Sequence, residues 1–155
     1  EMGVLDNWGD GTITRDVIDT MVGEHGRGGR HHGGGFYEYG EYGSKAIWPG
    51  LMDLYFNADA SVAEDDMKDR LLFRQVIEAL KCLETNVLRT VADGNIGSIM
   101  GIGAPAWTGG LIQFVNTYGL ERFSARCAEL ANQYGDRFDA PAIVGEKIAA
   151  GETFA

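Results

Sequence analysis

Apolar side chains recur every three or four residues through most of the chain after residue 61. The clearest series predicts one long helix, and its members are Leu72, Val76, Leu80, Leu83 and Val87. Similar series, together with candidate caps, predict five helices here, over residues 62–86, 91–101, 111–118, 120–134 and 141–150. This part of the chain is therefore predicted to be all-α.

The first part of the chain shows a weaker pattern. One short helix is predicted over residues 14–24, and glycines then exclude regular structure over residues 25–35. Residues 36–39 are predicted to be a short extended aromatic piece, and Trp48-Pro49-Gly50 is predicted to be a turn. The predicted fold is thus an all-α lobe of four to five helices, preceded by a glycine-rich, partly extended segment.

Local signals suggest how these helices begin and pack. Ser61 with Glu64, and Thr90 with Asp93, have capping-box spacing, and Thr108 is a candidate N-cap. Three glycines share one stripe of the helix over residues 91–101, where each costs about 1 kcal/mol, so we expect close backbone contact with another helix there, with a bound ligand as the less common reason. The glycines are Gly94, Gly97 and Gly101, and the predicted core face beside them is Ile96, Ile99 and Met100.

Charge and cysteine content narrow the classes of function. The net charge of −10 excludes a nucleic-acid binder, which needs a basic footprint, and it weakens the case for an anionic ligand such as coenzyme A. Cys82 and Cys127 are too few and too distant for a disulfide framework or zinc site, so reduced thiols and a cytoplasmic location are expected. No run of apolar residues is long enough for a transmembrane segment.

Candidate chemistry is concentrated in the glycine-rich loop. Glu24, His25, His31 and His32 carry metal-ligand groups, but their spacing fits no established zinc motif. Arg27 and Arg30 form the only basic cluster, which suits either a phosphate or coenzyme A contact or packing against a neighbouring domain.

Elsewhere the candidate motifs have simpler interpretations. Gly101, Gly103 and the pair Gly109-Gly110 match no nucleotide-binding fingerprint. Asp65-Asp66 is interpreted as a solvated helix start, and Trp48 and Trp107 as core residues. No catalytic, cofactor-binding or metal-binding residue is assigned.

Two segments resemble a known family. Arg27-Gly-Gly-Arg-His-His-Gly-Gly-Gly-Phe-Tyr-Glu-Tyr39 resembles the segment that closes the first C-terminal helical lobe of 3-hydroxyacyl-CoA dehydrogenases. Residues 70–80, followed by residues 91–110, resemble the second helical lobe of the multifunctional fatty-acid β-oxidation α chain. The chain departs from the family pattern at Gly28, His31 and Ala104, where leucine, lysine and phenylalanine are usual.

The resemblance implies a C-terminal fragment of an NAD-dependent enzyme that oxidises 3-hydroxyacyl-CoA to 3-oxoacyl-CoA. Residues 1–50 would be the end of the first lobe plus a linker, and residues 51–155 the second lobe. The family's catalytic His–Glu pair and its NAD site belong to a preceding Rossmann domain, so this fragment would hold no cofactor and be inactive alone. The implied partners are that domain, an enoyl-CoA hydratase domain and the parent's acyl-CoA substrate, and a thiolase subunit is left open.

Two other classes of function remain as alternatives. The chain is compatible with a stand-alone helical interaction module without catalysis, because of the bare glycine stripe and the start of the chain at Glu1 without an initiator methionine. It is also compatible with a small anion- or metal-binding protein that uses residues 25–32.

Overall fold

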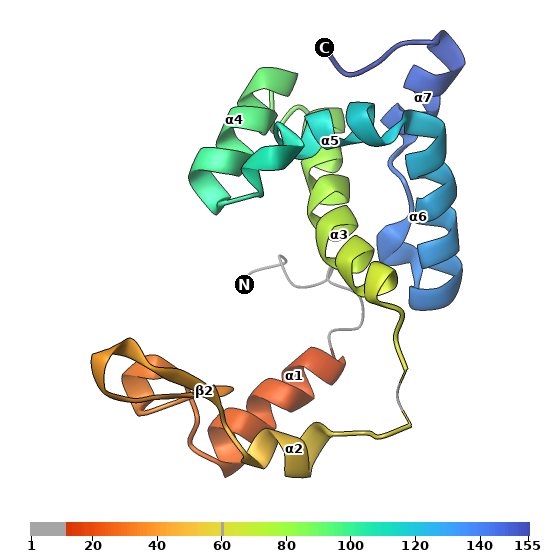
Figure 1. Cartoon of the computed structure of the whole chain (residues 1–155). Coiled ribbons are helices and arrows are strands. Elements are labelled where there is room, and N and C mark those ends of the chain that lie inside the picture. The colour runs from red at the N-terminus through yellow and green to blue at the C-terminus, as the bar shows by residue number, and fades with distance from the viewer. Residues whose placement is uncertain (1–11, 60) are drawn as a thin grey trace. The chain divides into compact units, whose positions relative to one another are not determined.

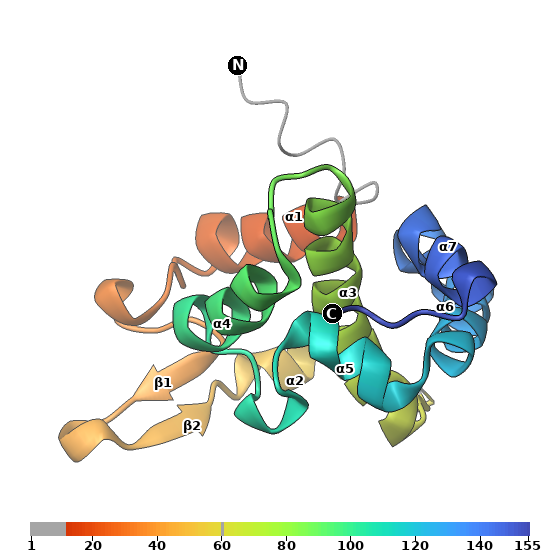
Figure 2. The same cartoon turned by 90° about the horizontal axis from the view of Figure 1, so that it is seen from above.

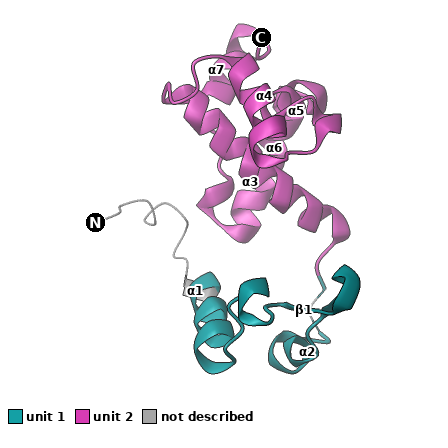
Figure 3. Ribbon diagram, turned by 90° about the vertical axis from the view of Figure 1, so that its left-hand side faces the viewer, with its two compact units in different colours: residues 1–61 teal, residues 62–155 magenta. Residues whose placement is uncertain are grey.

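The computed structural model describes residues 12–59 and 61–155. The chain divides into two compact units, Glu1–Ser61 and Val62–Ala155, which are coloured separately in Figure 3. The boundary between the two predicted lobes, at residues 50 and 51, comes from the family resemblance and stays a prediction.

The first unit combines short helices with a β-hairpin. Helix α1 (Thr12–Asp19) continues into a π-helical turn over Thr20–Glu24. The helix predicted over residues 14–24 is therefore confirmed. Strand β1 (Tyr37–Tyr39) confirms the predicted extended piece. It pairs antiparallel with β2 (Lys45–Ile47), with Glu38 opposite Ala46.

Four described elements of the first unit were not predicted. Two of them are short 3₁₀ helices, Arg30–His32 and Glu41–Gly43, and the first of these corrects the exclusion of regular structure over residues 25–35. Strand β2 has only three residues, too few for its alternation to stand out, and the hairpin tip holds Tyr42 at a positive φ of 58°. Helix α2 (Gly50–Tyr55) begins where the sequence suggested only a turn, with Pro49 as its N-cap residue. Proline is compatible with a first helical turn because the backbone N–H groups there have no intrahelical partner.

The first unit buries little apolar surface. Among its described residues, Met21 is the one buried large hydrophobic side chain. Many others are exposed, including Ile18, Val22, Phe36, Ile47, Met52 and Phe56. A unit with so small a core leaves apolar surface in need of a partner.

The second unit is entirely helical in its described elements and confirms the all-α prediction for this part of the chain (Figures 1 and 2). Its helices are α3 (Glu64–Glu84), α4 (Val91–Ile102), α5 (Leu111–Tyr118), α6 (Leu120–Tyr134) and α7 (Ala142–Ala150). The predicted ends at Gly119, Gly135 and Gly151 are confirmed, and each of these glycines has a positive φ.

An aromatic cluster forms the centre of the second unit. Phe73 of α3 stacks on Phe123 of α6, with ring centroids 4.7 Å apart, and meets Tyr118 of α5 edge-on at 5.3 Å. Val76, Ile77 and Leu80 of α3 are fully buried beside them. Burial of each such side chain contributes roughly 1.5–3 kcal/mol, so α3 is the helix against which the others pack.

The predicted caps had different outcomes. Thr90 caps α4, because its Oγ1 accepts a hydrogen bond from the Asp93 N–H at 3.0 Å. The predicted Ser61–Glu64 capping box is wrong, since α3 begins only at Glu64 and its N-cap residue is Ala63. Thr108 is not the N-cap of α5, which begins after Gly110.

Candidate functional site

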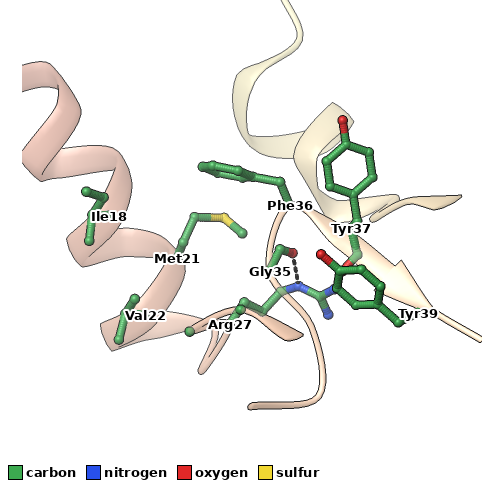
Figure 4. Close-up of a pocket in the computed structure, with 10 residues that line it drawn as sticks. Ile18, Met21, Val22, Arg27, Gly35, Phe36, Tyr37 and Tyr39 are labelled. Carbon is green, nitrogen blue, oxygen red and sulfur yellow. Dashed lines mark hydrogen bonds between the residues drawn. The ribbon is translucent and has the colours of Figure 1, made fainter. Parts of the chain in front are cut away.

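Arg27 organises the glycine-rich loop of the first unit. Its Nε donates a hydrogen bond to the Gly35 carbonyl oxygen at 2.7 Å (Figure 4), and its Nη2 donates to the Tyr37 carbonyl oxygen at 3.2 Å. The guanidinium also lies 4.4 Å from the centre of the Trp48 ring. Only 16% of the side chain is exposed. Arg27 therefore uses its donors to hold the loop against the hairpin, which leaves little of it for an anion.

The other basic and imidazole groups of this loop do not converge. Arg30 lies over the Tyr39 ring at 5.4 Å, and His25 packs against Trp48 with ring centres 5.3 Å apart. Within residues 12–59 and 61–155, no three His, Cys, Asp or Glu side chains are grouped so that they could hold a metal ion. The loop thus offers no assembled metal or phosphate site in its described form.

A shallow pocket of about 310 Å³ lies between α1 and the hairpin. Its lining is mainly apolar and aromatic, as Figure 4 shows, and includes Ile18, Met21, Val22, Phe36, Tyr37 and Tyr39. The donors of Arg27 at its edge are already bonded to carbonyl groups. The pocket therefore suits an apolar side chain of a neighbouring element better than a charged small molecule.

In the second unit, α4 caps the start of α5. Asn95 Oδ1 accepts hydrogen bonds from the Ile112 and Gln113 N–H groups at 3.1 and 2.9 Å. Ser98 Oγ accepts one from the Leu111 N–H at 3.2 Å. The first N–H groups of a helix have no intrahelical partner, so side chains of a different helix here supply the missing acceptors.

Close approach of the backbones makes this cap possible. A Cβ at Gly110 would overlap the Cα of Asn95, and a Cβ at Gly94 would overlap the Cδ1 of the buried Ile112. The prediction of close contact with another helix holds at Gly94, but the neighbour there is the Ile112 side chain and not the backbone of α5. It is wrong at Gly97 and Gly101, which are exposed and have no heavy atom within 4 Å of a built Cβ.

The opposite side of α4 is apolar and uncovered. Ile96 is 64% exposed and Met100 is 81% exposed, so the predicted core face of this helix is wrong, with Ile99 alone partly buried. The rotation of α4 about its own axis explains this exposure. Because Asn95 and Ser98 point toward α5, Ile96 and Met100 point away from it. We call Ile96, Gly97, Met100 and Gly101 the α4 face.

The connector after α4 presents a further exposed aromatic side chain. Trp107 is 76% exposed, so its interpretation as a core residue is wrong. Thr108 fixes this turn, since its Oγ1 donates to the Pro105 carbonyl oxygen at 2.7 Å and accepts from the Gly110 N–H at 3.1 Å. Trp107 touches Phe114 edge-on and otherwise faces outward. A tryptophan held in this way is typical of interface anchors.

The α4 face lies in a stretch without charge. No Asp, Glu, Lys or Arg occurs from Gly94 through Leu120, in a chain of net charge −10. Charged residues are depleted at the cores of protein interfaces, and large uncovered apolar patches mark docking sites. The α4 face is therefore the best candidate functional surface of the second unit.

Arg126 of α6 forms the main polar contact with α3. Its guanidinium donates to Asp66, to Asp69 at 2.7 Å and to Glu129 at 2.9 Å, and the Tyr134 hydroxyl donates to Asp66 at 2.9 Å. The hydrogen bond from Arg126 lowers the pKa of Asp66 below its usual value. Asp66 is thus part of the polar contact between α3 and α6, which we call the α3–α6 clasp and which consists of Arg126, Asp66, Asp69 and Tyr134. Asp65 stays exposed, as the sequence suggested.

The cysteines are free thiols in structural positions. Cys127 is fully buried, and this burial raises the pKa of its thiol to about 12. Cys82 is partly buried. A thiol with so high a pKa is a poor nucleophile, so Cys127 serves the core.

No protein-family model matches this chain. In the part of the chain that the structure describes, no helix combines the length and the apolar character needed to cross a bilayer.

Proposed function

We propose that this chain is the C-terminal helical part of a multifunctional fatty-acid β-oxidation enzyme, in which it supports an NAD-dependent 3-hydroxyacyl-CoA dehydrogenase. The resemblance of residues 27–39, 70–80 and 91–110 motivates the proposal. The uncovered α4 face carries it, because a supporting lobe must present an apolar surface to the part it supports.

In this proposal the chemistry lies upstream. NAD and the catalytic His–Glu pair belong to a preceding Rossmann domain, and an enoyl-CoA hydratase domain precedes that. The present chain forms part of the wall of the acyl-CoA cleft and holds its shape. Its donors are used internally, as Arg27 and Arg126 illustrate, which is consistent with a structural role.

The α4 face has the relief of a helix-packing surface. Gly97 and Gly101 leave a bare strip, and Ile96 and Met100 stand beside it as ridges. Small residues let a second backbone approach closely, and ridges then fill the grooves of the partner helix. The occupant that we propose is a helix from the upstream part of the parent polypeptide.

Docking can be tested with charge substitutions. We expect Ile96→Lys and Met100→Lys each to weaken binding to the upstream part of the parent by tenfold or more, measured by calorimetry. The Tm of the chain should stay within a few degrees, because both side chains are exposed. Leu71→Lys is a matched control, since Leu71 is 72% exposed on α3.

Activity provides the second readout. We expect no NADH formation from 3-hydroxybutyryl-CoA by this chain alone, and formation once the upstream part is added. Turnover by the chain alone would refute the assignment of the chemistry to the upstream part. Unchanged binding in both lysine variants would remove the α4 face from the proposal.

The second candidate function is a stand-alone helical interaction module. The same α4 face and the exposed Trp107 favour it, because both suit docking on a separate protein. The binding and activity measurements distinguish the two candidate functions, because a stand-alone module would bind no dehydrogenase part and support no turnover. Its own support would be a specific complex with a different chain that Ile96→Lys abolishes.

A further inference from the structure

We draw no further inference here: the strongest candidate, the α4 face with its exposed Ile96 and Met100, already serves the docking role proposed above, and nothing in the described residues shows a different occupant.

Discussion

Asn95 lies inside α4, yet its side chain satisfies the backbone of a different helix. The two N–H groups that it caps, of Ile112 and Gln113, begin α5, which has only eight residues. So short a helix is marginal without tertiary support, and an unsatisfied N–H in a partly buried site is costly. Asn95 is therefore a structural residue whose importance is invisible from its position in the sequence.

We expect Asn95→Ala to lower the free energy of unfolding by about 1–2 kcal/mol, the usual cost of losing a helix cap. Asn95→Asp keeps an oxygen acceptor at the same place and adds a negative charge near a helix N-terminus, so it should restore most of the loss. Urea unfolding followed by circular dichroism measures both. Equal stability of the alanine variant and the unaltered chain would show that the cap contributes nothing.

Asp66 makes the α3–α6 clasp sensitive to acid. The hydrogen bond from Arg126 is the main cause that lowers the folded-state pKa of Asp66, so its contribution to stability is present above the ordinary aspartate pKa of 3.8 and is lost as the pH falls through the lower folded pKa. We expect Asp66→Asn to be less stable than the unaltered chain at pH 7. The difference should shrink below pH 3.8, as urea unfolding at several pH values would show.

Asp65→Asn is the matched control for this measurement. Asp65 is the neighbouring residue in the first turn of α3, carries the same charge and is exposed. It shares the interaction with the helix N-terminus but not the bonds to Arg126 and Tyr134. If both variants lost the same stability with the same pH dependence, the effect would belong to the helix end and not to the clasp.

At the scale of the element, α4 contains glycines of two kinds. Gly94 faces α5 and has no room for a side chain, whereas Gly97 and Gly101 face open space. Glycine in a helix interior costs about 1 kcal/mol relative to alanine. The chain therefore carries an intrinsic cost at Gly97 and Gly101 that no contact within the described structure offsets, and the proposed docking supplies a reason for it.

We expect Gly97→Ala to raise the free energy of unfolding by about 0.5–1 kcal/mol and yet to weaken docking to the upstream part of the parent. Gly110→Ala should lower it by roughly 2–4 kcal/mol, because Gly110 has a φ of 113° and its Cβ would overlap Asn95. Thermal unfolding and calorimetry measure the two effects. Unchanged docking in the Gly97 variant would mean that close backbone approach is not needed there.

At the scale of the whole molecule, the chain is two units joined by an exposed connector. Residues 56–59 and 61–63 are all exposed, and the hydrogen bond among them is donated by the Asp59 N–H to the Asn57 side-chain oxygen. The second unit has its own aromatic core, whereas the described core of the first is very small. The two units should therefore differ in their resistance to unfolding.

We expect limited proteolysis to cut first between residues 56 and 63 and to leave the second unit intact, because proteases need an extended, exposed segment. Chymotrypsin is a suitable probe, since Phe56 is 64% exposed at the start of this connector. Mass spectrometry would identify the fragments. First cleavage within α3 or α6 would contradict the division into units.

Helix positions could be predicted from the sequence because apolar periodicity, capping residues and glycine stops are local signals. Thr90 and Gly119 fulfilled their predicted roles for this reason. The short hairpin strand β2 and helix α2 were missed, since three and six residues carry too little pattern. The resemblance to the dehydrogenase family remains a prediction about function.

The sequence by itself determined the positions of the five longer helices of the second unit, the acidic charge of the chain and the absence of charged residues from Gly94 through Leu120. Only the tertiary structure decided which way α4 faces. A helix rich in both glycine and large apolar residues has two stripes that suit packing. The periodicity of the sequence does not show which of the two stripes is buried. The cap from Asn95 and Ser98 to α5 fixes the rotation of α4, and that rotation leaves Ile96 and Met100 in solvent.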